Sequence, residues 1–218
     1  MAGTAPRALR ALLAAAAILT MTTAAGAHPH ILPSVRTGLI FSPDGRVTAI
    51  QHAWTYDSAY STYAARDIDA NKDGSIEKDE LAAFAKRQID AFAAHNYFTT
   101  VTTPAGSFEF DLPESYGVER LGDGRLKLTF TVPLKSAPMV DRGIIVEIHD
   151  PNFFAYFTVA DGGVHLIGGH EGCAQTVAGP QPIDLKNTPS IPAVFWQALK
   201  GVKSAGLQFV NRITVTCP

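Results

Sequence analysis

The chain contains one segment whose side-chain types and spacing match a known metal-binding pattern. This segment, residues 69–80, reads Asp-Ala-Asn-Lys-Asp-Gly-Ser-Ile-Glu-Lys-Asp-Glu. An EF-hand loop supplies oxygen ligands to Ca²⁺ from positions 1, 3, 5, 7, 9 and 12, with glycine at position 6, where the chain turns sharply. The residues at the ligand positions are Asp69, Asn71, Asp73, Ser75, Glu77 and Glu80, and Gly74 stands at position 6. The pattern predicts a calcium loop; a polar surface turn between two helices is the alternative.

Apolar residues on both sides of this loop recur at helical spacing. They predict an entering helix over about 58–68 and an exit helix over about 77–95. Only one such loop occurs in the sequence, whereas calcium sensors usually carry EF-hands in pairs. The weak, millimolar-range binding of extracellular modules fits a single loop better. We therefore expect the ion to hold two helices in place rather than to act as a signal.

The first 27 residues have the composition of a secretory signal peptide. Arg7 and Arg10 precede an apolar run over residues 11–21, and the stretch ends in an Ala-x-Ala pattern at Ala27. The run is too short to span a bilayer, and the small residues predict cleavage after Ala27. We therefore expect a periplasmic protein. Loss of both arginines makes the formal net charge of −2 more negative, so nucleic acid is not an expected partner.

Cleavage at that position would place His28-Pro29-His30 at the new N-terminus. A terminal histidine can chelate a metal through its α-amine and its Nδ1 together. His30, or a histidine from another strand, could complete a site for zinc, nickel, cobalt or copper. Pro29 has no amide hydrogen, which excludes the square-planar copper and nickel motif that needs deprotonated amides. A frayed, solvated terminus is the alternative.

Three residues elsewhere are candidates to join this terminal site: His52, Asp57 and His149. Pairing across the predicted turn at 42–46 places His30 opposite Ser58 and beside Asp57. His52 shares a strand face with two aromatic residues, so a packed position in the core is the more natural interpretation.

The two cysteines, Cys173 and Cys217, lie in a chain that we expect to be exported, so we predict that they form a disulfide. A metal-binding pair is the alternative. The remainder of the chain consists mostly of short strand-like segments separated by Gly, Pro, Asp and Asn. They cover residues 31–41, 47–56, 98–103, 107–111, 126–133, 143–149, 153–159, 164–167 and 207–215.

Many short strands and few crossover helices predict a mainly β (α+β) protein, an antiparallel β-sandwich with an inserted helix-loop-helix EF-hand. The length fits one β-rich domain over residues 28–218, with the insertion at about 58–95. The sequence contains no serine-hydrolase, P-loop, dinucleotide-binding or zinc-protease motif, so catalysis is not expected.

Several motifs, in order, resemble a known family. They are His28-Pro29-His30, His52-Ala53-Trp54-Thr55-Tyr56-Asp57, the loop 69–80, Tyr97-Phe98-Thr99, Asp150-Pro151 followed by Phe153-Phe154, Gly172-Cys173 and Val215-Thr216-Cys217-Pro218. Together they are similar to the periplasmic family of unknown function number 1007, over essentially the whole chain after the leader. The chain departs from the family pattern at His149, where an aromatic residue is expected, and at Phe153-Phe154, where tyrosines are common.

The resemblance implies a periplasmic component of an uncharacterised ABC-type transport system. Its implied partner is an inner-membrane metal transporter, and its implied role is accessory, in zinc, nickel or cobalt traffic. The favoured function is therefore a metal-binding accessory or solute-binding-type protein with one calcium loop. A copper enzyme of the N-terminal histidine-brace type and an envelope protein with only a structural calcium site are the alternatives.

Overall fold

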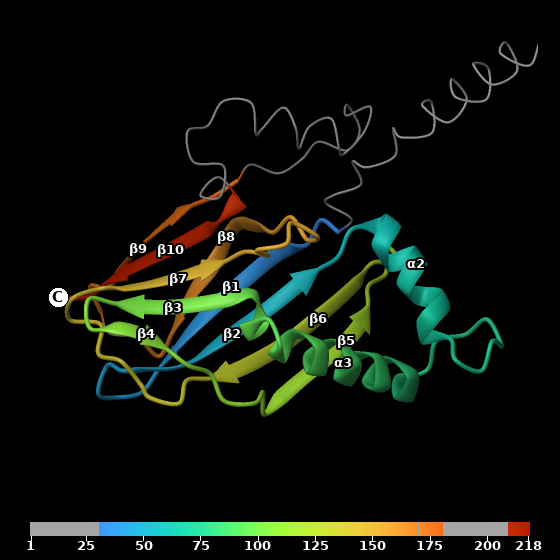
Figure 1. Ribbon diagram of the computed structural model, residues 1–218, viewed down its shortest axis with the longest axis horizontal. Helices are drawn as coiled ribbons and strands as arrows, with labels where there is room; N and C mark the ends of the chain where they lie inside the picture. Colours follow the sequence, from blue (N-terminus) through green and yellow to red (C-terminus); the bar gives the residue numbers. More distant parts are fainter. Residues whose placement is uncertain (1–30, 170, 181–208) are drawn as a thin grey trace, which may run out of the picture.

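The computed structural model describes residues 31–169, 171–180 and 209–218 (Figure 1). The predicted leader, His28 and His30 lie outside these residues. The described part is mainly β, with two sheets and two α-helices, which confirms the expected α+β class. Among the described residues, no helix has the length and apolar character needed to cross a bilayer.

Five strands form each sheet. The first sheet has the order β5-β6-β2-β1-β8, with β1 (Ser34–Phe41), β2 (Val47–Thr55), β5 (Ser115–Arg120), β6 (Leu126–Pro133) and β8 (Thr158–Ile167). The second sheet has the order β4-β3-β7-β10-β9, with β3 (Thr99–Thr103), β4 (Gly106–Phe108), β7 (Ile144–Ile148), β9 (Ala174–Ala178) and β10 (Asn211–Thr216).

Alternating burial along the central strands builds one shared core. In the first sheet Ile50 and Trp54 point inward from β2, whereas Gln51 between them is exposed. In the second sheet Val146 and Ile213 are fully buried. Both sets belong to a single apolar cluster, as expected when two half-buried sheets contribute one face each.

The expectation of a purely antiparallel arrangement is wrong at one strand pair. Strand β8 runs parallel to β1, whereas every other described strand pair is antiparallel. After Ile148 the chain leaves the second sheet and enters the first sheet beside the start of β1, where Ile31 and Ala155 form a parallel bridge. The start of β8 pairs with the start of β1, Ser34 with Thr158, and from there both strands run in the same direction to the pair Ile40–Ile167.

Two helices follow the first hairpin, at the predicted place. Helix α2 (Ser58–Ile68) begins after Asp57, whose side chain accepts from the Tyr60 amide, as an N-cap residue does. Helix α3 (Lys78–Ala93) lies beside β5 (Figure 1). A short turn of 3₁₀ type, η1 (Asn96–Phe98), leads from α3 into the second sheet. The helices thus flank one end of the first sheet and present the loop between them.

Candidate functional site

The loop between α2 and α3 projects from the body of the fold (Figure 1) and is organised by its own side chains. The Asp69 carboxylate accepts from the amides of Asp73 at 3.1 Å and Gly74 at 3.0 Å. The Asp73 carboxylate accepts from the Ser75 amide at 2.8 Å. Gly74 has a φ of +86°, a left-handed conformation that glycine adopts without a steric penalty. The predicted ligand residues therefore line a tight turn.

Glu80 closes this loop. Its Oε1 accepts from the amide of Ala70 at 2.9 Å, and its Oε2 accepts from the amide of Glu77 at 3.1 Å. The second bond is half of a capping box at the start of α3. The carboxylate at position 12 thus lies next to the backbone of position 2, and the two ends of the segment are drawn together.

The charges of the loop repel one another. A hydrogen bond with Glu80 raises the pKa of Glu77; burial and the charges of Asp73 and Glu80 raise it further. Glu77 Oε2 is buried and has no hydrogen-bond partner within the residues that the structure describes. The pKa of Glu80 is lowered, first by the backbone hydrogen bond at Glu77. Among the described residues, no three His, Cys, Asp or Glu side chains form a group arranged to hold a metal ion. The loop carboxylates instead accept largely from backbone amides.

The second predicted site, at His28 and His30, lies outside the described residues, but its point of attachment is defined. The Ile31 amide donates to the Phe154 carbonyl at 3.3 Å, and the Leu32 amide donates to Asp57 Oδ2 at 2.9 Å. Because Asp57 Oδ1 also caps α2, both oxygens of this carboxylate accept from backbone amides. Asp57 therefore fixes the start of the described chain to the start of the first helix.

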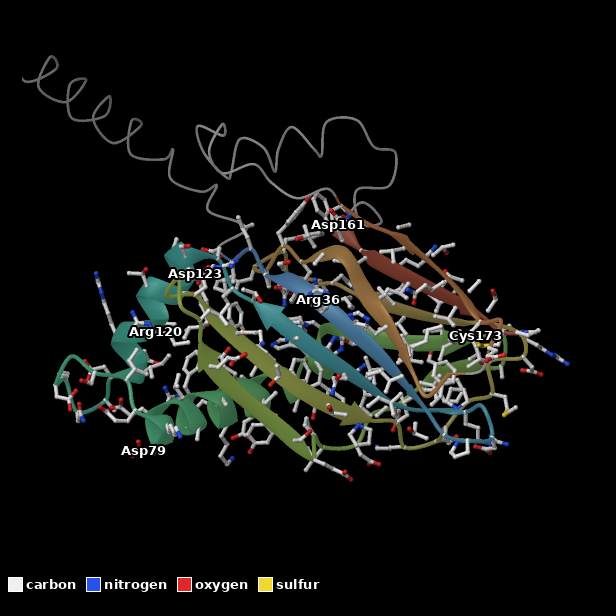
Figure 2. The ribbon with its side chains drawn as sticks, turned by 180° about the vertical axis from the view of Figure 1, so that it is seen from behind. Arg36, Asp79, Arg120, Asp123, Asp161 and Cys173 are labelled. Atoms are coloured by element: carbon white, nitrogen blue, oxygen red, sulfur yellow. A yellow bond between two sulfur atoms is a disulfide. The ribbon has the colours of Figure 1, made fainter. Side chains whose placement is uncertain are left out.

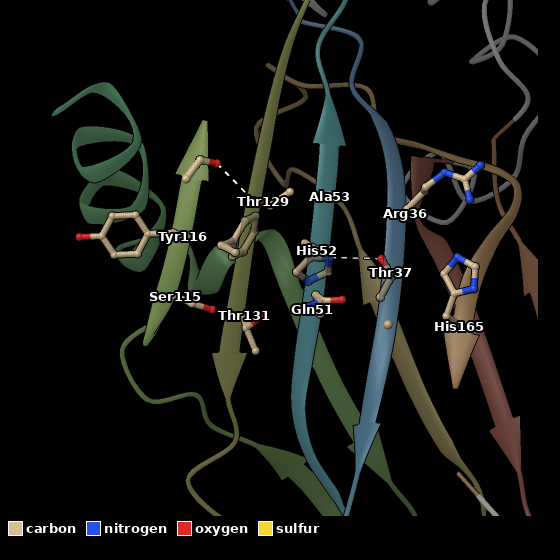
Figure 3. Close-up of a pocket in the computed structure, with 13 residues that line it drawn as sticks. Arg36, Thr37, Gln51, His52, Ala53, Ser115, Tyr116, Thr129, Thr131 and His165 are labelled. Atoms are coloured by element: carbon tan, nitrogen blue, oxygen red, sulfur yellow. Dashed lines mark hydrogen bonds between the residues drawn. The ribbon is translucent and has the colours of Figure 1, made fainter. Parts of the chain in front are cut away.

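His52 lies in the core between the two sheets, with no exposed surface. Its Nδ1 is 3.1 Å from the Thr37 hydroxyl of β1, and its Nε2 is 3.2 Å from the Thr99 hydroxyl of β3 (Figure 3 shows the Thr37 bond). The Thr99 hydroxyl donates to the Tyr97 carbonyl at 2.9 Å. It must therefore accept from the imidazole, which puts the proton on Nε2 and makes Nδ1 the acceptor of the Thr37 hydroxyl.

Burial lowers the pKa of His52 to about 3, so the ring is neutral at ordinary pH. Both ring nitrogens are hydrogen-bonded, which leaves no lone pair for a metal. His52 thus joins the first sheet to the second. The sequence indicated its packed position but gave no signal for its partners, because Thr37 and Thr99 come from distant strands.

His149 is the third candidate, and it directly follows β7, the central strand of the second sheet. Its amide donates to the Phe98 carbonyl at 3.0 Å, whereas its buried Nδ1 has no hydrogen-bond partner in the described part of the chain. The His95 ring stacks on the Phe98 ring, with the centroids 5.3 Å apart. No described ring contact or hydrogen bond joins His149 to His52, so the structure does not bring these two candidates together.

Phe98 ends an unusual turn. Asn96, Tyr97 and Phe98 all have φ between 52° and 54°, the left-handed region that costs non-glycine residues about 1 to 2 kcal/mol each. The Asn96 side-chain amide donates to the Thr99 carbonyl at 2.8 Å and stabilises the turn. Tyr97 is buried, and its carbonyl accepts the bond from Thr99. The strained turn therefore places the Thr99 hydroxyl within hydrogen-bonding distance of His52. The sequence did not predict this turn.

Cys173 and Cys217 form a disulfide, as predicted, and no free cysteine occurs. The bond links the start of β9 to the segment after β10. It confirms the expected pairing and excludes the alternative of a metal-binding cysteine pair in this state of the chain.

Comparison with known sequences adds one finding. A family described as "Protein of unknown function (DUF1007)" matches residues 13–217. No curated protein matches the chain. Because the match covers nearly the full sequence, with the calcium-type loop, the His52 position and both cysteines inside it, the chain belongs to the DUF1007 family of proteins of unknown function.

Proposed function

We propose that this protein is a periplasmic metal-binding accessory protein whose loop 69–80 binds one Ca²⁺ as an EF-hand inserted into a β-sandwich. The observation that carries the proposal is the closure of the loop by Glu80, whose carboxylate bonds to the Ala70 amide. This contact and a longer one from the Asn71 amide bring the carboxylate of position 12 to the backbone of positions 2 and 3, as a loop that closes around one ion requires. The unpartnered Glu77 Oε2 lies in the same loop and offers a further oxygen.

A calcium ion would stabilise this loop, because its positive charge would offset the repulsion between the carboxylates that coordinate it. Carboxylate oxygens have further lone pairs beside those used by the amides, and Asn71 and the Ser75 carbonyl supply neutral oxygens. The two helices are already attached to the first sheet. The Ser61 hydroxyl accepts from the Leu126 amide at 3.0 Å, and α3 lies against β5. An ion in the loop would tie the free ends of both helices together.

The proposal assigns capture of a transition metal such as zinc, nickel or cobalt to the processed terminus. There the α-amine and imidazole of His28, with His30, would supply nitrogen ligands. His149 is the described histidine best suited to join them, because its buried Nδ1 has no partner. An inner-membrane metal transporter is the partner that the family resemblance suggests. The disulfide supports export, since such bonds persist in oxidising compartments.

Thermal unfolding in calcium and in excess chelator tests the calcium site. A dissociation constant of about 1 mM and about 10 mM calcium give roughly 1.4 kcal/mol of stabilisation. For a chain of this size, that raises Tm by about 3 to 6 °C. Glu80→Gln should remove the increase. Asp79→Asn is the matched control, because it makes the same charge change at a neighbouring exposed residue that is not at a ligand position.

An equal Tm of the wild type in calcium and in chelator would contradict the calcium proposal. Retention of the full calcium effect in Glu80→Gln would contradict the assigned ligand set. The transition-metal part is tested separately by titrating zinc, nickel, cobalt and copper into the mature protein at saturating calcium. Absence of binding by every one of these metals would leave only the calcium site.

A further inference from the structure

A shallow trough with a volume of about 560 Å³ crosses the outer face of the first sheet (Figure 3). Strand register sets one row of its lining residues. Ser115 pairs with Thr131, Thr131 with Gln51, Gln51 with Gly38, and Gly38 with His165. Each of the five strands thus contributes one residue to the row. Four of them carry hydroxyl, amide or imidazole groups, and the fifth is Gly38, beside which the Ile167 side chain packs.

A second row runs beside the first. Gly117 pairs with Thr129, Thr129 with Ala53, and Ala53 with Arg36. The trough is hollow because Gly117 and Ala53 carry at most one methyl group. A Cβ added to Gly117 would meet no heavy atom within 4 Å, so the space above this residue is open.

The trough has a cationic end. Arg36 and His165 stand together at the β1–β8 side (Figure 3), and none of the described residues that line the trough is Asp or Glu. Among the described residues, the Arg36 guanidinium has one hydrogen bond, to the Gly162 carbonyl at 3.4 Å, and no ion pair. By contrast, Lys127 on β6, two strands away in the same sheet, forms an ion pair with Glu119. Arg36 therefore has free N–H groups available to an anion.

We propose that the trough binds a small organic anion that carries both carboxylate and hydroxyl groups. The planar fork of Arg36 matches a carboxylate and can bind it with two parallel hydrogen bonds. The hydroxyls of Thr129 and Thr131 and the amide of Gln51 can each donate and accept, as the hydroxyl groups of such a ligand require. The site is separate from the loop 69–80 and does not rest on the proposed metal function.

Isothermal titration calorimetry with tartrate, at constant free calcium, tests this inference. Tartrate has two carboxylates and two hydroxyls. Succinate lacks the hydroxyls, erythritol lacks the carboxylates, and sulfate is a plain anion. We expect tartrate to bind, succinate to bind more weakly, and erythritol and sulfate to give no measurable heat. Arg36→Gln should weaken tartrate binding about tenfold, because a charge-assisted hydrogen bond is lost.

Two further variants separate binding from folding. Gly117→Val places a side chain in the open space of the trough and should abolish tartrate binding without lowering Tm. Arg120→Gln is the control, because Arg120 is exposed on the same sheet but does not line the trough (Figure 2). Absence of tartrate binding, or equal losses in Arg36→Gln and Arg120→Gln, would overturn the proposal. Equal affinity for sulfate or erythritol would overturn the hydroxycarboxylate class.

Discussion

The buried histidine between the two sheets makes acid stability a direct test of the core. The pKa of His52 is lowered to about 3 by burial, whereas an unfolded histidine has a pKa of about 6.5. Between these values the unfolded chain binds a proton that the folded chain does not. Stability therefore rises with pH, and it falls as the pH decreases below about 6.5.

The magnitude follows from the width of that window. Well below pH 6.5 each pH unit is equivalent to about 1.36 kcal/mol, and near pH 6.5 to about half of that, so acidification from about pH 6.5 to 4.5 should cost about 2.3 kcal/mol through His52 alone. Urea unfolding at several pH values measures this cost in the wild type and in His52→Gln, which cannot titrate. The other described histidines and the carboxylates are common to both proteins, so their contribution cancels in the difference.

The variant should therefore lose less stability than the wild type between pH 6.5 and 4.5, by about 2.3 kcal/mol, whatever its absolute stability. The comparison uses the change in the free energy of unfolding with pH. It does not use the free energy at one pH, because the substitution also changes packing. Parallel pH profiles of the two proteins would refute the assignment of His52 as a buried, neutral link between the sheets.

Three other outcomes are expected. Thr99→Val leaves the His52 Nε2–H and the Tyr97 carbonyl without their partner and should lower the free energy of unfolding by about 2 to 5 kcal/mol. Urea unfolding measures this loss. Thr102→Val in the same strand is the control and should change the free energy of unfolding far less. Reduction of the Cys173–Cys217 bond, which has a sequence separation of 44, should cost about 4 kcal/mol on the chain-entropy estimate, and an unchanged Tm in reductant would contradict this. One residue added before His28 should weaken transition-metal affinity, because the chelating α-amine moves away; equal affinities by titration would exclude the terminal site.

The two helices were predictable from the sequence because their signals are local. The expected helix over 58–68 coincides with α2, and the exit helix is two residues shorter at its end than the expected 77–95. Asp57 caps the first helix, and Glu80 closes the loop before the second. All of these interactions join residues close in the chain, so spacing alone carries the information.

Two strands were not predicted, and both are mostly exposed. Strand β9 has no buried residue, and β5 has none that is fully buried, so neither shows the alternation that marks a half-buried strand. Strand β8 was expected as two segments, because Asp161-Gly162-Gly163 is typical of a turn. In the structure these residues lie within one strand, opposite an irregularity in its pairing with β1.

The register of the first hairpin is a further feature that the sequence did not predict correctly. The expected pairing across the turn would place Ser34 opposite Trp54. A bulge next to Ile40 inserts one residue, and Ser34 pairs with Thr55 instead. In the candidate functional site, too, local features were predictable and contacts between distant strands were not. The loop 69–80 is contiguous and visible in the sequence, whereas the Thr37 and Thr99 partners of His52 depend on three strands meeting in space.

The position of β1 has a consequence for how the chain reaches its final state. Ser34 pairs with Thr55 on one side and with Thr158 on the other. As the chain is synthesised, the hairpin can close early, while the second edge of β1 keeps its N–H and C=O groups unpaired until β8 exists. Such an edge is a template for strands of other molecules, and distant pairing of this kind is slow. A chain that ends before β8 would therefore retain a local hairpin but would be prone to aggregate.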